Sequence, residues 1–263
     1  MLIIGKAEKS EETMIKKKLR YGLVIALVFS FLYSAGYPGE RALDCKFYKA
    51  YVSGEMSRWP GYIDQLEDIY TKHPSPNLLY DIVKAYYGYI AYAIGLEEDR
   101  TARDYLSQGE PYLDKLTQMD GYLAEAKAFK GAFIAFEIGM NTSKAVFLGP
   151  RSMRYINQAL ELEPDNVHAL LEKGNAEYHM PRVFGGSYEK ATHYFQKAVQ
   201  ILEHNSTNLS CNWFYMNALA WLAQSYEKAG FTHRADKTYK RILSLEPDFS
   251  WVAEELYPEF KQR

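Results

Sequence analysis

Apolar residues near the C-terminal end of the chain recur at helical spacing. The first run holds Leu219, Leu222, Ala223 and Tyr226 and is followed by Gly230; the second holds Ala235, Tyr239, Ile242 and Leu245 and is followed by Pro247. Steps of three and four residues are typical of amphipathic helices, and Gly and Pro mark helix ends. The pattern therefore predicts two antiparallel helices joined by a short glycine turn.

The same pattern of small and apolar positions recurs upstream. The matching positions are Gly174, Asn175, Ala176, Ala191, Phe195 and Ala198 in one unit, Gly131, Ser152, Ile156, Ala159 and Pro164 in a second, and Gly88, Ala102, Leu106 and Gly109 in a third. Residues 59–74 correspond to the second half of a first, degenerate unit. The sequence LEPD occurs at residues 162–165 and 245–248, which indicates two units of about 41 residues each.

These units resemble the tetratricopeptide repeat (TPR) over roughly residues 44–247, with the clearest matches from residue 121 onward. The resemblance implies an all-α fold: a right-handed superhelical solenoid of four to five helical hairpins, closed by a C-terminal capping helix at residues 250–260. The expected organisation is residues 37–120 as degenerate N-terminal repeats and residues 121–263 as the TPR array with its cap.

The N-terminal segment has the pattern of a secretory signal peptide. A basic block at residues 16–20 precedes an apolar run from Gly22 to Gly36, which is short for a membrane-spanning helix. We expect residues 1–36 to be the signal, with residues 1–13 belonging to a start codon assigned too far upstream. The mature chain is then periplasmic or secreted; the alternative is a chain anchored in the membrane by an uncleaved signal.

Charge and cysteine content narrow the possible partners. The net charge of −2 gives no reason to expect a nucleic-acid partner. Cys45 and Cys211 are the two cysteines, far apart in sequence, so no disulfide framework is expected. Two unpaired buried thiols are the favoured interpretation, and a single bridge between them is the alternative.

Motifs for catalysis or cofactor binding are not found in the sequence. There is no HExxH, Walker loop, dinucleotide fingerprint or nucleophile elbow, and no Cys–His cluster has metal-ligand spacing. Ser187 after the Gly185–Gly186 pair is interpreted as a helix N-cap rather than part of a phosphate loop. We therefore expect neither an enzyme nor a cofactor or metal site.

TPR arrays hold peptides or protein partners in a groove lined by the first helix of each repeat, so the resemblance implies a non-catalytic scaffold. The groove residues carried over by register are Tyr89, Tyr92, Phe136, Asn175, Tyr178, His179, Gln224 and Glu227. This face is aromatic and amide-rich, and such faces suit an extended peptide backbone, a sugar edge or a partner helix. Packing between helices is the alternative role for the aromatic members.

Two hairpin turns carry apolar insertions, at residues 141–151 and 179–187. Their central residues are Phe147 and Leu148 in the first and Val183, Phe184, Gly185 and Gly186 in the second. Both turns are expected on the same edge of adjacent repeats. We hypothesise that they form one ridge, which either braces the solenoid through contact between Phe147 and Phe184 or presents a surface to a partner.

A narrower resemblance rests on Pro181, Phe184, Gly185, Gly186, Lys190, Ala191 and Phe195. This segment is similar to exported repeat proteins of Bacteroidetes-type bacteria and, weakly, to the T component associated with TRAP transporters. The second resemblance implies an alternative function, a small-ligand-binding helper of a transporter. No cysteine follows the apolar run directly, whereas that family is usually lipid-anchored.

Overall fold

The computed structural model describes residues 38–205 and 209–263, and residues 42–263 form one compact unit. The predicted signal segment, residues 1–36, lies outside the described residues. The helices are α2 (Pro38–Val52), α3 (Trp59–Lys72), α4 (Pro76–Gly95), α5 (Asp99–Leu116), α6 (Leu123–Met140), α7 (Ala145–Leu162), α8 (Val167–His179), α9 (Tyr188–Asn205), α10 (Trp213–Lys228), α11 (Thr232–Leu245) and α12 (Tyr257–Gln262). Short helical turns η1 (Met56–Arg58), η2 (Thr142–Lys144), η3 (Arg182–Phe184) and η4 (Trp251–Leu256) stand between them.

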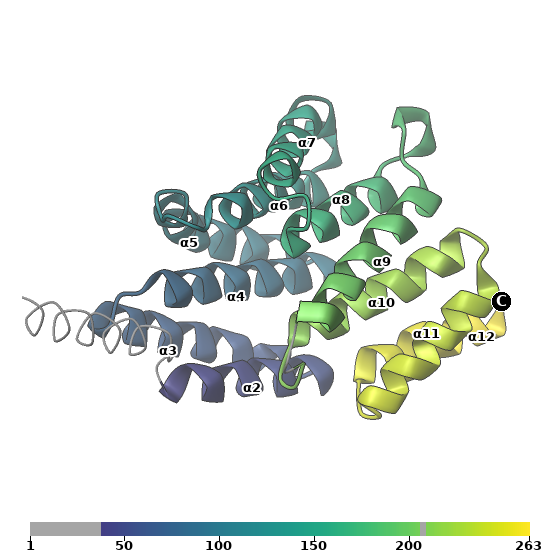
Figure 1. Ribbon diagram of the computed structural model, residues 1–263, viewed down its shortest axis with the longest axis horizontal. Coiled ribbons are helices and arrows are strands. Elements are labelled where there is room, and N and C mark those ends of the chain that lie inside the picture. Colours follow the sequence, from purple (N-terminus) through teal and green to yellow (C-terminus); the bar gives the residue numbers. More distant parts are fainter. Residues whose placement is uncertain (1–37, 206–208) are drawn as a thin grey trace, which may run out of the picture. The chain divides into compact units, whose positions relative to one another are not determined.

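Consecutive helices pack as hairpins, so the predicted all-α solenoid is confirmed (Figure 1). The pairs α4–α5, α6–α7, α8–α9 and α10–α11 have the most extensive helix–helix packing. Side-chain caps fix where three of the first helices begin: Ser75 accepts from Leu78 N at 3.2 Å, and Asn166 and Asn212 cap α8 and α10 in the same way. The two LEPD segments end α7 and α11, as their prolines predict.

The small residues of the repeat pattern are the points where two helices of a hairpin touch. A methyl group on Gly174 of α8 would lie 2.6 Å from the Phe195 ring of α9, and one on Gly131 of α6 would lie 2.6 Å from Ile156 of α7. Because real carbon atoms do not approach so closely, these positions accept only glycine without a shift of the partner. The sequence pattern therefore correctly located these contacts within the α6–α7 and α8–α9 hairpins.

The C-terminal cap is confirmed as a helical segment over the last hairpin. Phe249 and Val252 are buried, and the rings of Tyr257 and Phe260 lie 5.6 and 5.4 Å from the ring of Tyr239 on α11. The segment begins as the π-helical η4 and continues as α12. It covers the apolar face that a terminal repeat otherwise exposes.

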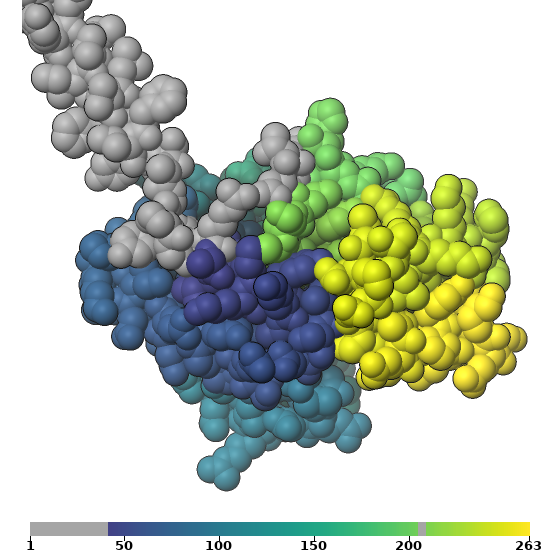
Figure 2. All heavy atoms as spheres, turned by 90° about the horizontal axis from the view of Figure 1, so that it is seen from below, coloured from purple at the N-terminus to yellow at the C-terminus, as the bar shows by residue number. Residues whose placement is uncertain are grey.

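The first hairpin packs against the C-terminal end of the array. Tyr48 of α2 donates to Glu246 Oε2 at 2.7 Å, and Tyr51 donates to Asn217 Oδ1 of α10 at 3.1 Å. In Figure 2 the surface of α2, in purple, adjoins the C-terminal helices, in yellow. Sequence repeats predict contacts only between neighbours, and these contacts join residues about 170–200 positions apart.

A disulfide joins the same two regions. Cys45 of α2 and Cys211, two residues before α10, are bridged with their Cα atoms 4.6 Å apart. The prediction of two unpaired thiols is wrong. It failed because distance along the sequence was taken as distance in space, whereas the array bends back and places α2 beside the start of α10.

The interior where α4 meets α3 and α10 is built around Gly88. A methyl group there would lie 2.5 Å from the Trp59 ring and 2.9 Å from the Trp213 ring, and these two indoles are themselves 5.1 Å apart. Gly88 is thus the position at which α4 approaches helices from both ends of the chain.

We expect Gly88→Ala to lower the free energy of unfolding by about 1–3 kcal/mol, because the added carbon overpacks two rigid indoles. Gly61→Ala on α3 is the matched control, since nothing lies within 4 Å of its added carbon. That variant should gain about 0.5–1 kcal/mol through helix propensity. Urea denaturation measures both changes, and equal midpoints for the two variants would contradict this account of the interior.

Candidate functional site

The first helices α4, α6, α8 and α10 carry the predicted groove residues, and the structure divides these into buried and accessible groups. Tyr89 is buried, with its ring 4.5 Å from Tyr105 of α5, so it belongs to the core of its hairpin. Tyr92 and Phe136 are half-buried, and Phe136 lies 5.4 Å from the ring of Tyr87. Asn175, Tyr178 and Gln224 are half-buried as well, and His179 is exposed.

The middle of the inner face is filled by contacts between first helices. Tyr87 of α4 donates to Glu172 Oε1 of α8 at 2.7 Å, and its ring lies 6.2 Å from Phe214 of α10. Tyr80 of α4 and His168 of α8 are hydrogen-bonded at 2.5 Å. An extended peptide cannot run along this part of the array, because side chains of opposing helices already occupy it.

Two buried titratable groups belong to this filled region. Burial raises the pKa of Glu172 to about 7, against the partial effect of hydrogen bonds from Tyr87 and Asn175. Burial lowers the pKa of His168 to about 3, helped by the charge of Lys84. Glu172 is therefore close to half-ionised at neutral pH, while His168 is neutral.

Beyond the filled region, aromatic side chains of α8, α9, α10 and η4 form a partly exposed surface. We call it the aromatic surface and define it by Tyr178, His179, Tyr188, Trp221 and Trp251. Tyr178 is the centre, with ring centroids 5.0 Å from His179, 5.3 Å from Tyr188 and 5.3 Å from Trp221. Trp221 also lies 5.3 Å from His179 and 6.3 Å from Trp251.

His179 ends α8 at the edge of the aromatic surface. Its side chain is exposed overall, but the neighbouring rings exclude water from part of the imidazole and so lower the pKa of His179 below its usual value. A neutral imidazole carries a free nitrogen lone pair at neutral pH, which is the form that binds metals.

Trp221 was not predicted as a groove residue, because the predicted register of α10 is displaced from the observed one by one position. The groove residues predicted on α10 are Gln224 and Glu227, and helical spacing extends their stripe back to Ala220, which is fully buried. The half-buried stripe runs through Asn217, Trp221 and Gln224, at steps of four and three residues. The signal was present, since Trp221 is the largest side chain on that helix face.

Glu227 is a structural residue within this region. It accepts hydrogen bonds from Tyr239 of α11 at 3.2 Å and from Arg263 at the end of the chain. Its carboxylate therefore ties the C-terminal cap to α10, and a partner would have to displace both donors to reach it.

The Gly185–Gly186 pair closes the α8–α9 turn onto the end of α8. Gly185 has φ +99°, and a methyl group on Gly186 would lie 1.9 Å from the Met180 carbonyl oxygen. Ser187 caps α9 by accepting from Lys190 N at 3.2 Å, which confirms the capping interpretation. Glycine suits both positions, because the turn has a positive φ at Gly185 and brings Gly186 against the backbone of Met180.

The predicted bracing contact between the two insertions is wrong. Phe147 and Phe184 are among the most exposed apolar residues of the described chain, so neither ring is buried against the other. The first insertion is mostly helical: η2 covers Thr142–Lys144 and α7 begins at Ala145, with Pro150 inside it. The apolar residues of both turns point into solvent, and Leu148 is half-buried.

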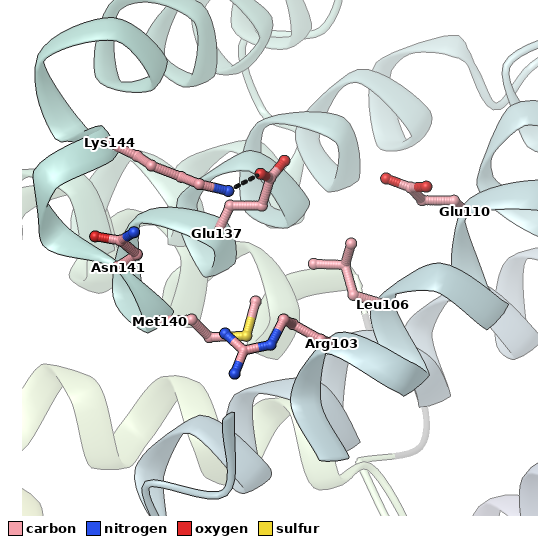
Figure 3. A pocket seen from close by; sticks show the side chains of 7 residues that line it. All are labelled: Arg103, Leu106, Glu110, Glu137, Met140, Asn141 and Lys144. Atoms are coloured by element: carbon pink, nitrogen blue, oxygen red, sulfur yellow. Dashed lines mark hydrogen bonds and ion pairs between the residues drawn. The ribbon is translucent and has the colours of Figure 1, made fainter. Parts of the chain in front are cut away.

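A surface pocket of about 300 Å³ lies between α5, α6 and η2 (Figure 3). Its lining residues are Arg103, Leu106, Glu110, Glu137, Met140, Asn141 and Lys144. Lys144 Nζ pairs with Glu137 Oε2 at 2.8 Å, so part of the charge around the pocket is already satisfied. Its volume is at the lower limit of ligand pockets, which span roughly 300–1,000 Å³.

Clusters of metal ligands and membrane-spanning helices are both absent from the part of the chain that the structure describes. No group of three or more His, Cys, Asp or Glu side chains is arranged to hold a bare metal ion there. Within the same residues, every helix is too short or too polar to cross a bilayer. A ligand that supplies most of its own metal coordination, and so needs only one protein nitrogen, is compatible with the first finding.

Comparison with known proteins gives a likeness of fold. No protein-family model and no curated protein matches the chain. Among solved structures, the HusA haemophore from Porphyromonas gingivalis is similar, with a TM-score of 0.58 and 18% sequence identity over 72% of this chain and 93% of that chain. Identity at this level shows a shared all-helical fold and nothing finer about this chain.

Proposed function

We propose that this chain is an exported, non-catalytic binding protein that holds a flat aromatic ligand of the haem type on its aromatic surface. The observation that carries the proposal is His179, an accessible imidazole of lowered pKa set between the rings of Tyr178 and Trp221. This combination provides one nitrogen ligand for iron and ring faces and edges for a porphyrin.

Three further features support this proposal. The similar fold belongs to a haemophore, whose name describes a haem carrier. Side chains of opposing first helices fill the middle of the predicted groove, so the aromatic surface is the part of that groove that stays accessible. Lys228 continues the stripe of Trp221 and Gln224 on α10 and is exposed, so it offers a positive charge for the carboxylates of a porphyrin.

Export is supported by the disulfide as well as by the signal-like segment. Disulfides form and persist in oxidising compartments, which include the periplasm and the extracellular space. The bridge between Cys45 and Cys211 therefore fits a protein that leaves the cytoplasm.

The second candidate function is capture of a protein or peptide segment on the same aromatic surface. It is favoured by an amide beside the rings: Gln224 is half-buried and lies one helical turn after Trp221 on α10. A side-chain amide beside aromatic rings can donate to and accept from the backbone of a bound peptide.

Haem titration of the chain, followed by Soret absorbance, tests the first proposal. We expect saturable binding, with His179→Ala weakening it at least tenfold because the iron loses its protein ligand, and Trp221→Ala weakening it through lost ring contact. His193→Ala is the matched control: His193 is also exposed and also lies beside a tyrosine ring, but on α9 outside the aromatic surface.

Equal affinities of the His179 and His193 variants, or no binding by the parent chain, would rule out the haem proposal. The second candidate would then stand if the chain captures an envelope protein and Trp221→Ala with Gln224→Ala weakens that capture by about 2 kcal/mol. Asn175→Ala is unsuitable for this purpose, because Asn175 also donates to the buried Glu172 at 3.2 Å.

A further inference from the structure

Two hairpin turns end in large apolar side chains that contact almost nothing. We call them the apolar tips and define them as Val146 with Phe147, and Val183 with Phe184. Their exposed fractions are 74%, 82%, 86% and 73%. Monomeric proteins seldom leave four such residues this exposed without a use for them, since each costs free energy in contact with water.

Both tips stand on helical turns at the same edge of the array. Each lies where the first helix of a hairpin turns into the second, and the α6–α7 and α8–α9 hairpins are neighbours. Phe147 lies in the first turn of α7, and the Phe184 turn is held against Met180 by Gly186 (the turn above α8 and α9 in Figure 1). The tips are therefore presented as fixed points and do not depend on a loop that must first become ordered.

Positive charge accompanies the apolar residues. From residue 138 to residue 160 the chain has Lys144, Arg151 and Arg154 and no acidic residue. Lys144 pairs with Glu137, whereas Arg151 and Arg154 are exposed and make no ion pair with any described residue. Arg182 lies directly beside Val183, and no acidic residue occurs between residues 178 and 188.

We propose that the apolar tips insert into the surface of a membrane that contains anionic lipid. Valine and phenylalanine side chains gain free energy on entering the acyl boundary, and Arg151, one turn after Phe147, and Arg182, next to Val183, meet the lipid phosphates. A fluid bilayer accepts both tips whatever their spacing, whereas a protein partner would need two apolar sockets at a matching distance. Both tip segments carry basic residues and no acidic ones, so they are attracted to an anionic membrane surface.

Vesicle co-sedimentation tests the proposal with the chain from Tyr37 onward, which keeps the whole compact unit of residues 42–263 and omits the apolar signal-like segment. Vesicles of phosphatidylethanolamine with phosphatidylglycerol should bind the chain, and phosphatidylcholine vesicles should bind it more weakly. Phe147→Ser with Phe184→Ser should lower the partition coefficient by about tenfold for each substitution, which corresponds to about 1.4 kcal/mol each.

The matched control is Leu162→Ser with Leu245→Ser. These leucines are half-exposed at the ends of α7 and α11, the edge of the hairpins away from the tips. The control variant should bind vesicles like the parent, and circular dichroism should show both variants folded. The proposal is overturned if the parent does not bind anionic vesicles, if the two double variants bind equally, or if the tips bind a purified envelope protein and no vesicle.

Discussion

Replacing Cys45 and Cys211 with serine is expected to lower the free energy of unfolding by up to about 5 kcal/mol. The bridge closes a loop of 166 residues along the chain, and in the chain-entropy account a loop of that length restricts the unfolded state by about this amount. For a protein of this size, such a loss lowers the melting temperature by roughly 10 °C or more. The effect should be large because the bridge links parts of the molecule that the repeat pattern does not connect.

Thermal melts of the oxidised chain, the reduced chain and the double variant measure this effect. The reduced chain and the variant should melt at the same temperature, because both lack the same constraint. Met216→Leu, a change of similar size within buried α10, serves as the control and should shift the melt by far less. Identical melting temperatures for oxidised and reduced protein would contradict the role given to the bridge.

The buried Glu172 should make stability fall as the pH rises. Its pKa is about 7 in the folded state and near 4.5 when unfolded, so the unfolded chain releases the proton at lower pH. The stability that protonated Glu172 contributes is fully present below its pKa in the unfolded state. It is lost as the pH rises through its pKa in the folded state. Between pH 5.5 and pH 8 the free energy of unfolding should fall by about 2 kcal/mol through this effect.

Glu172→Gln isolates this contribution, because an amide of the same shape still accepts from Tyr87. His168 acts in the opposite sense: its pKa is lowered to about 3, so its contribution is present above pH 6.5 and lost as pH falls. The difference in unfolding free energy between parent and variant removes the His168 effect. That difference should change by about 2 kcal/mol from pH 5.5 to 8, with the variant relatively more stable at pH 8.

Glu161→Gln, at an exposed position of α7, is the control for this measurement and should track the parent at every pH. Urea denaturation at a series of pH values provides the data. A parent–variant difference that stays constant across the series would mean that Glu172 does not change its protonation state on folding.

The hairpins were predictable because their signals are local. Gly174 against Phe195 and Gly131 against Ile156 are contacts within one hairpin, and the small–large pattern that specifies them lies within about 25 residues. Capping residues such as Ser187 and the proline after each LEPD segment also act over a few positions. Helical spacing and the Gly, Pro and capping residues therefore carried enough information to give the fold class and the ends of several helices.

The candidate site was less predictable because it depends on how the array bends. Whether Phe136 is accessible depends on whether first helices meet, and its contact with Tyr87 and that of Tyr87 with Phe214 show that they do. The predicted register of α10 differs from the observed one by one position, which is a rotation of about 100° around the helix axis and exchanges a core side chain for a surface one. The disulfide and the contacts of Gly88 with two tryptophans depend on the same long-range bend.

The contacts of α2 with the far end of the chain affect the order in which the protein assembles. Most repeat arrays fold by propagation from one unit to the next, since every contact is local. Here Tyr48 reaches its partner Glu246 only after nearly 200 further residues have been made. A chain that crosses a membrane N-terminus first therefore delivers α2 early and without its partner, and this helix completes its packing only when α10 and α11 have followed it across.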